Sequence, residues 1–139
     1  MLLLKNSNLL DKFRGEVPID KAKTFYIDTL GKVLKKPQKE LCPLQPTRLH
    51  KVHLNYLGKI VQVIDGVQVY TQAGWKDVDK IKKGDKVIYF EAVIFDYGGT
   101  DLRMMFCDVE SRQSKEVQEE LIKTSFEQAI VNGFLIREV

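Results

Sequence analysis

Hydrophobic and polar residues alternate with a period of two through much of the middle of the chain. Within residues 50–56, Val52 and Leu54 fall on one side and His53 on the other, which is typical of a half-buried strand. Further runs rich in β-branched and aromatic residues cover 59–64, 67–71, 86–95 and 102–109. We expect an antiparallel sheet that curls into a small, partly open barrel.

Short glycine-containing turns separate these runs. Asp65-Gly66 lies between two alternating runs, a pattern that favours a type I′ hairpin because both central positions need a positive φ. Gly98-Gly99 joins the last two runs in the same way. Strands adjacent in sequence are therefore predicted to be neighbours in the sheet.

The hydrophobic period changes near the C-terminus. Ser114 is a suitable helix N-cap and Gly133 a suitable stop, and residues 134–139 could add a short edge strand. The apolar positions between the two recur about every 3.6 residues, which predicts an amphipathic helix: they are Val117, Leu121, Ile122, Phe126, Ile130 and Val131.

The first 48 residues carry weaker signals. Ser7 or Asn8 could cap a short helix that ends at Gly15, and residues 22–28 and 32–36 around Gly31 indicate a hairpin. Three of the four prolines fall within residues 37–48, which predicts a connector that neither a ladder nor a helix passes through.

Together these patterns predict an α+β fold. It would comprise a small curled antiparallel sheet or partly open β-barrel, a C-terminal amphipathic helix, and a short N-terminal helix plus hairpin. The length of 139 residues suits a single domain. Within it we expect a basic N-terminal subregion (1–36), the Pro-rich connector (37–48), a β-rich core (49–110) and a C-terminal helix and tail (111–139).

Composition narrows the class of protein. Hydrophobic residues make up 44% of the chain and charged residues 29%, so disordered and low-complexity classes are excluded. The apolar stretch before Lys5 is too short for a secretory signal, and Cys42 and Cys107 form no disulfide framework. We expect a soluble, intracellular, cytoplasmic protein with reduced thiols and no membrane partner.

Charge is distributed unevenly. Residues 1–60 hold twelve Lys or Arg against five acids, and the remainder holds ten against fourteen. Such halves can complement each other within the fold or between copies as a homo-oligomer, or the basic half can face an acidic protein or complex. For the last case we predict a partner surface made of Lys32, Lys35, Lys36 and Lys39.

A second cluster interleaves aromatic residues with lysines. Bases stack on aromatic rings while ammonium groups meet phosphates, so this composition suits single-stranded nucleic acid. Three aspartates dilute the cluster, and Trp75 could equally anchor a turn. The predicted contact residues are Tyr70, Trp75, Lys76, Lys80, Lys82, Lys83 and Lys86.

No set of residues indicates catalysis, a metal or a cofactor. His50 and His53 are spaced H-x-x-H on a predicted strand, where residues three apart point to opposite sides. No second pair of ligands occurs at zinc spacing, and no signature places a base beside Cys42, Cys107 or a serine. Phosphate-binding glycine loops are absent from the sequence.

Residues 66–90 contain the patterns T-x-x-G and G-D-x-V. In Thr71, Gly74, Gly84, Asp85 and Val87 the segment resembles the opening hairpin of Hint domains, the hedgehog and intein family. The resemblance covers about twenty of the 139 residues and implies self-cleavage by a Cys or Ser about nine residues before the threonine. That position holds Gln62, and no T-x-x-H follows. We therefore interpret the segment as ordinary strand-turn-strand sequence and reject self-cleavage.

The sequence thus predicts a non-enzymatic binding protein. It would act as an adaptor, structural subunit or inhibitor by docking its basic surface on an acidic partner. The alternative is a single-stranded nucleic-acid-binding β-barrel module.

Overall fold

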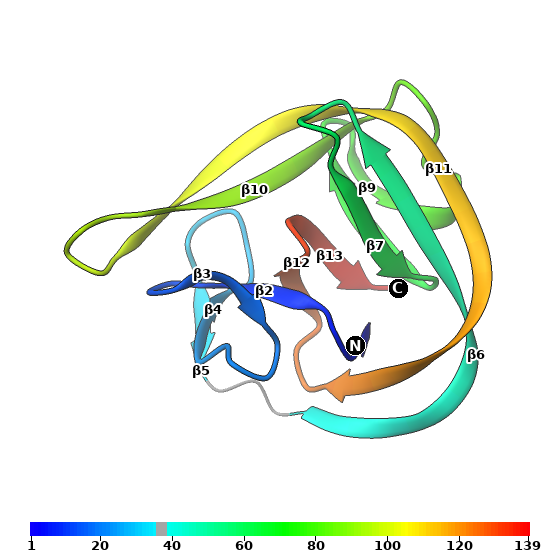
Figure 1. The fold of residues 1–139 in the computed structure, drawn as a ribbon. Coiled ribbons are helices and arrows are strands. Elements are labelled where there is room, and N and C mark those ends of the chain that lie inside the picture. The colour runs from blue at the N-terminus through cyan, green and yellow to red at the C-terminus, as the bar shows by residue number, and fades with distance from the viewer. Residues whose placement is uncertain (36–38) are drawn as a thin grey trace.

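The computed structural model describes residues 1–35 and 39–139, and these fold almost entirely as β-strands (Figure 1). A single turn of 3-10 helix, η1 (Val78–Lys80), is the only helical element in the described ranges. The strands are β1 (Leu2–Leu4), β2 (Asn8–Asp11), β3 (Gly15–Pro18), β4 (Thr24–Tyr26), β5 (Val33–Lys35), β6 (Lys39–Leu54), β7 (Ile60–Ile64), β8 (Val67–Thr71), β9 (Gly74–Asp77), β10 (Lys86–Ile94), β11 (Thr100–Thr124), β12 (Gln128–Val131) and β13 (Phe134–Glu138).

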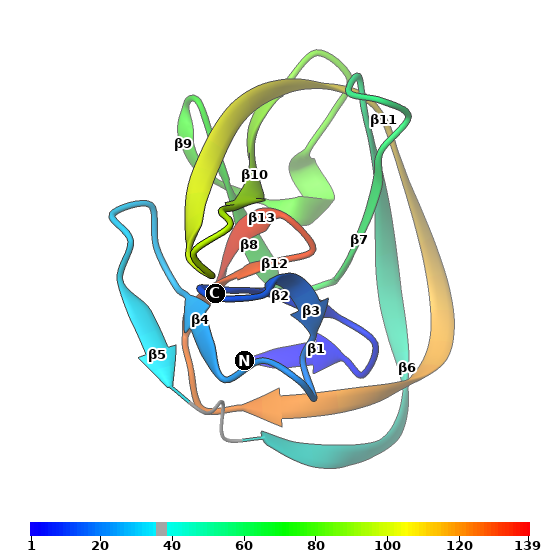
Figure 2. The same cartoon turned by 60° about the vertical axis from the view of Figure 1, so that its left-hand side comes forward.

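Two long strands form the frame of the molecule. β6 and β11 pair antiparallel along most of their length and curve together around the remaining strands (Figures 1 and 2). β11 pairs with β10 up to Asp108 and with β6 from Val109 onward, and a register shift follows directly between Val109 and Ser111. Such bulges bend a strand, which allows one strand to serve two sheets.

The central strands are buried on both faces. In β13, Phe134 and Ile136 point into the main core, while Leu135 points into a smaller cluster on the opposite face. β2 divides in the same way at Leu9 and Leu10. Successive side chains of these strands therefore point into two different cores. For this reason the strands appear in the sequence as continuous apolar runs.

The predicted α+β class is wrong, because the C-terminal helix is not formed. Residues 114–124 belong to β11, which has β6 on one side and, at its end, β1 on the other. Leu121 and Ile122 are adjacent and both buried, whereas Phe126 and Ile130 lie after the strand and in β12. The apolar spacing that suggested a helix therefore combines residues of two separate strands, β11 and β12.

The N-terminal helix is also not formed. Residues 8–11 form β2, in which Leu9 and Leu10 are both buried because the strand is covered on both faces. A turn at residues 12–14 joins β2 to its partner β3. The predicted hairpin around Gly31 is confirmed, since β4 pairs antiparallel with β5.

The Pro-rich segment does not interrupt the sheet. Residues 39–48 continue β6, and Pro46 lies opposite Gln118 of β11. Pro43 and Leu44 fall in a register shift opposite Glu120, where no regular ladder bond is required. Residues 36–38 lie outside the described part of the chain.

The strand positions predicted from alternation are confirmed, but one predicted pairing is wrong. β7 pairs with β6, while β8 pairs with β9, β10 and β13. The Asp65-Gly66 turn therefore carries the chain from one sheet to another and closes no hairpin. The β10–β11 hairpin is confirmed.

Candidate functional site at the chain ends

The two ends of the chain lie side by side, the N-terminus buried and Glu138 exposed. β1 pairs with the last residues of β11, which places Met1 beside Thr124. β13 lies between β12 and β8 and ends at Glu138, whose carboxylate Oε2 lies 3.8 Å from the Met1 nitrogen. Figures 1 and 2 show both ends enclosed by the curve of β6 and β11.

Met1 is held through its backbone. Its nitrogen donates to the carbonyl oxygens of Thr124, at 3.0 Å, and Phe126, at 3.3 Å. Its carbonyl oxygen accepts from the Thr124 amide at 2.9 Å and from the Thr124 hydroxyl at 2.7 Å. Only 6% of Met1 is exposed. Both donors to the carbonyl come from Thr124, which fixes the Met1 backbone against the end of β11.

The side chain of Met1 supplies no nucleophile. A thioether has no proton to lose, so its sulfur cannot take up an acyl group and remain neutral. Cys107 belongs to the main core, where burial raises the pKa of its thiol and keeps it protonated. Thr124 provides the hydroxyl that contacts Met1.

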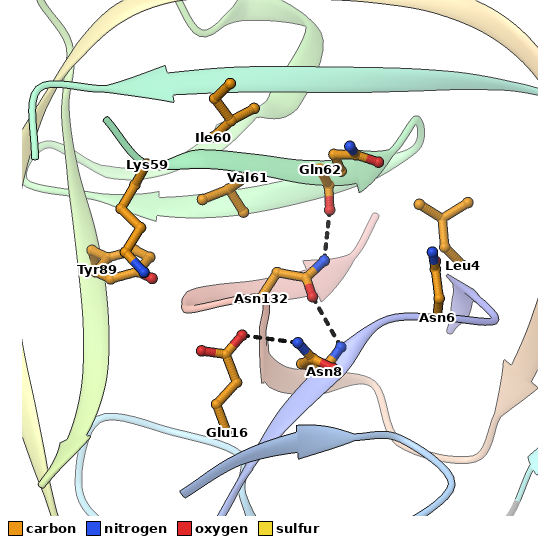
Figure 3. Close-up of a pocket in the computed structure, with 10 residues that line it drawn as sticks. All are labelled: Leu4, Asn6, Asn8, Glu16, Lys59, Ile60, Val61, Gln62, Tyr89 and Asn132. Atoms are coloured by element: carbon orange, nitrogen blue, oxygen red, sulfur yellow. Dashed lines mark hydrogen bonds between the residues drawn. The ribbon is translucent and has the colours of Figure 1, made fainter. Parts of the chain in front are cut away.

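A polar pocket of about 270 Å³ lies between β7 and β2 (Figure 3). Asn132 spans it: its Oδ1 accepts from the Asn8 amide at 2.9 Å, and its Nδ2 donates to the Gln62 carbonyl at 2.8 Å. Asn8 Nδ2 in turn donates to Glu16 Oε1 at 3.0 Å. These groups satisfy one another, so the pocket ties the N-terminal strands to the C-terminal hairpin.

The turn that presents Asn132 packs against an aromatic ring. Asn132 and Gly133 both have positive φ, as a two-residue hairpin turn requires. A Cβ at Gly133 would lie 2.2 Å from Cε2 of Tyr89, so only glycine fits there. Burial raises the pKa of Tyr89 to about 12, which keeps its phenol neutral.

The residues that carried the Hint resemblance form one corner of the fold. The Thr71 hydroxyl donates to the Gly74 carbonyl at 2.6 Å, and Thr71 lies opposite Val87 across β8 and β10. The Asp85 carboxylate accepts from the Lys82 amide at 3.0 Å. Burial opposes that charge, but hydrogen bonds from Lys76 and the Lys82 amide lower the pKa of Asp85 overall.

The predicted nucleic-acid residues are largely engaged within the protein. Trp75 packs on Tyr70 at 5.1 Å, and the Arg137 guanidinium covers its ring at 4.4 Å. Three of the lysines form ion pairs: Lys76 with Asp85, Lys80 with Asp77 and Lys86 with Asp108. Lys82 and Lys83 are exposed.

The predicted basic partner surface is divided. Lys32 and Lys35 are exposed on the β4–β5 hairpin, whereas Lys39 forms an ion pair with Asp20. Lys36 lies outside the described residues. His50 is buried and His53 partly buried on β6, and no cluster of three or more metal-ligating side chains occurs in the described chain.

Sequence reasoning missed the residues that meet at the ends. Met1, Thr124 and Glu138 carry no motif, and only the pairing of β1 with β11 brings them together. Asn132-Gly133 was a detectable signal, because Asn-Gly favours a hairpin turn, but it was assigned to the end of a helix.

The comparisons with known proteins point to one structural group. No family model and no curated protein matches the chain. The DnaX mini-intein from Spirulina platensis matches with a TM-score of 0.69 at 16% identity, over 99% of this chain and 100% of that one. A DnaB intein from Synechocystis sp. PCC 6803 matches with a TM-score of 0.62 at 12% identity, over 100% and 99%. An intein from a hyperthermophile matches with a TM-score of 0.63 at 12% identity, over the full length of both chains.

These findings overturn the function predicted from the sequence. The three solved structures reported above are inteins, which are protein-splicing domains and not adaptors, inhibitors or nucleic-acid-binding modules. The prediction of a non-enzymatic protein is contradicted for the same reason. No helix among the described residues is long and apolar enough to cross a membrane. The local resemblance at residues 66–90 was therefore a correct sign of the architecture, and the chain has the fold of inteins.

Proposed function

We propose that this chain is a self-processing domain of the intein type, which acts on a peptide bond at its own end. The observation that carries the proposal is the meeting of the two ends, with Glu138 Oε2 3.8 Å from the Met1 nitrogen inside an intein-like fold. A segment joined to Met1 by a peptide bond would have its amide nitrogen at this position.

The surroundings of that nitrogen suit an amine better than an amide. An amide has one N–H, whereas an ammonium has three, and three acceptors lie around it: two carbonyl oxygens and the Glu138 carboxylate. A buried ammonium needs such partners, and a buried carbonyl without a donor is costly. Cleavage of the bond before Met1 therefore gains hydrogen bonds.

The reaction that fits these residues is hydrolysis. A water oxygen attacks the carbonyl carbon joined to the Met1 nitrogen, and the carbon–nitrogen bond breaks. The nitrogen keeps the electron pair and takes the proton that the attacking water gives up. The Glu138 carboxylate is placed to accept that proton from the water and pass it to the nitrogen. Because Met1 is a thioether, transfer of the acyl group to the side chain of residue 1 is not available.

The test is a fusion of a reporter protein to Met1 of the full chain. We expect two products separated at the bond before Met1, identified by intact mass. Glu138→Gln should slow their formation, whereas Glu119→Gln, an exposed residue of β11, should not. A fusion that stays intact under all conditions tested would overturn the proposal.

Two parts of the sequence prediction remain proposals. A cytoplasmic location agrees with the free thiols of Cys42 and Cys107, and cell fractionation tests it. Association of copies through oppositely charged halves should appear in light scattering at low salt and disappear at high salt.

A further inference from the structure

A polar group of three residues, of which only His50 is buried, lies outside the site described above. His50 of β6 is fully buried, with an exposed fraction of 0%. Its Nε2 lies 3.1 Å from Asp65 Oδ1, and its Nδ1 lies 2.9 Å from Arg112 Nη1. Arg112 also donates from Nε to the Ile81 carbonyl at 2.9 Å. The group joins β6, β11, the turn after β7 and the end of η1.

The partners of His50 fix its tautomer. A guanidinium only donates, so Nδ1 must accept and carry no proton. A neutral imidazole has one N–H, which is therefore on Nε2 and points to the Asp65 carboxylate. With both nitrogens occupied, His50 is not available as a general base.

Asp65 connects this group to the chain ends. Its amide donates to the Arg48 carbonyl at 2.9 Å, and the turn at residues 65–66 leads directly into β8. The first residue of β8, Val67, lies opposite Glu138 in the β8–β13 pair. The position of the turn therefore influences the strand that carries the Glu138 carboxylate.

We propose that neutral His50 is a positioning residue for the chain ends: by holding Asp65 and Arg112 together, it fixes the turn at 65–66 and thereby places Glu138 beside Met1. Its effect on cleavage rests on the proposed function, whereas its effect on the Val67–Glu138 pair does not.

Protonation would break this arrangement. A proton on Nδ1 would point at the Arg112 guanidinium, so the hydrogen bond is lost and two cations face each other. The charged groups around the ring are Asp65 and Asp79, which favour the proton, and Arg112, which opposes it. Burial is the largest influence and lowers the pKa of His50, so the neutral form holds the turn at neutral pH.

Nuclear magnetic resonance tests the coupling in the full chain. The backbone amide signals of Val67 and Glu138 should shift together with the titration of His50. In His50→Gln the Nε2 donor to Asp65 remains but nothing titrates, so the shifts should disappear while the fold persists. His53→Gln, on the same strand, is the matched control and should keep them. Absent shifts in the unaltered chain, or equal shifts in His50→Gln, would overturn the proposal.

The reporter fusion supplies the second arm. One pH unit below the apparent pKa of His50, about a tenth of the molecules keep the neutral ring, so the cleavage rate should fall about tenfold. The rate in His50→Gln should not show this step. A step of equal size in both would overturn the positioning role. If no fusion is cleaved but the amide shifts follow His50, the proposed function fails and the positioning role stands.

Discussion

Two hairpins that both contain apolar strands and a turn with glycine lie in opposite surroundings in the molecule. β12–β13 and β10–β11 both join apolar strands through glycine-containing turns. The first lies at the centre, where Phe134 is 0% exposed, and the second projects from the body, where Tyr97 at its tip is 81% exposed (Figure 1). The two hairpins differ in exposure because different strands border them.

The difference lies in what borders each strand. β13 is bordered by β12 along one edge and by β8 and β10 along the other. Its side chains are also buried on both faces, Phe134 and Ile136 in the main core and Leu135 in the smaller cluster. Beyond Phe90, β10 pairs only with β11, although Ile94 touches Gly15. A two-stranded ribbon is marginally stable alone. We expect the central hairpin to carry stability and the projecting one to open locally.

The largest difference in the free energy of unfolding should come from replacing one phenylalanine by alanine in each hairpin. Phe134→Ala should lower the free energy of unfolding by about 3–5 kcal/mol, because it leaves a cavity in the core. Phe106→Ala, at a side chain of the β10–β11 hairpin that is 55% exposed, should cost about 1 kcal/mol or less. Urea unfolding measures both, and equal losses would contradict the comparison.

The turn glycines should differ next. Gly133→Ala must fit a Cβ 2.2 Å from Tyr89 at a φ of +88°, so a loss of about 2–4 kcal/mol is expected. Gly98→Ala has a similar φ of +82° but open space, which predicts a loss of about 1 kcal/mol. Thermal unfolding of the two variants compares packing with backbone strain. If Gly133→Ala unfolds at the same temperature as the unaltered chain, the turn does not pack against Tyr89 as described.

Removing the asparagine clamp should have a smaller effect. Asn132→Gly keeps the positive φ but removes the bonds to Asn8 and Gln62, so about 1–3 kcal/mol should be lost. Asp96→Gly, near the projecting turn, is the matched control and should change little. Hydrogen exchange should show the loss at β2 and β7. Unchanged hydrogen exchange at both strands would mean that Asn132 does not hold β2 and β7 in place.

The smallest expected effect is a pH dependence of the free energy of unfolding that comes from His50. Because burial lowers the pKa of His50 in the folded state, the unfolded state takes up a proton first as the pH falls through about 6.5. Stability is therefore full above that value and falls below it, by at most about 1.4 kcal/mol per pH unit. His50→Gln should remove the slope. Urea unfolding over this pH range that gives rising stability on acidification would contradict the assignment.

The sequence revealed where strands occur better than how they pair. β10 was located from its run of β-branched and aromatic residues, which are buried in succession from Val87 to Phe90. Alternation located β7 and β8, because strands with one dominant apolar face keep a period of two. It failed at Leu121 and Ile122, where β11 is covered on both faces and adjacent apolar residues imitate a helix. It also could not show that the turn at 65–66 changes sheets, because that depends on the distant strands β6 and β13.

The candidate site was invisible for a related reason. Met1, Thr124 and Glu138 are ordinary residues whose chemistry comes from their meeting, and a search for nucleophiles and bases finds none of them. The five Hint-like residues carried the correct fold but were set aside, because Gln62 stood where a nucleophile was expected. The chain thus has the fold of the matched inteins without a Cys or Ser at the position where the resemblance implied the nucleophile.

The most direct test of the account is the origin of the oxygen in the cleaved product. The reporter fusion is incubated in water enriched in oxygen-18, at several protein concentrations, and the released segment is weighed. We predict that its new carboxylate contains oxygen-18 and that the rate does not change on dilution, since each chain cuts its own bond. A fusion that remains whole, or a rate that falls with dilution, would contradict it.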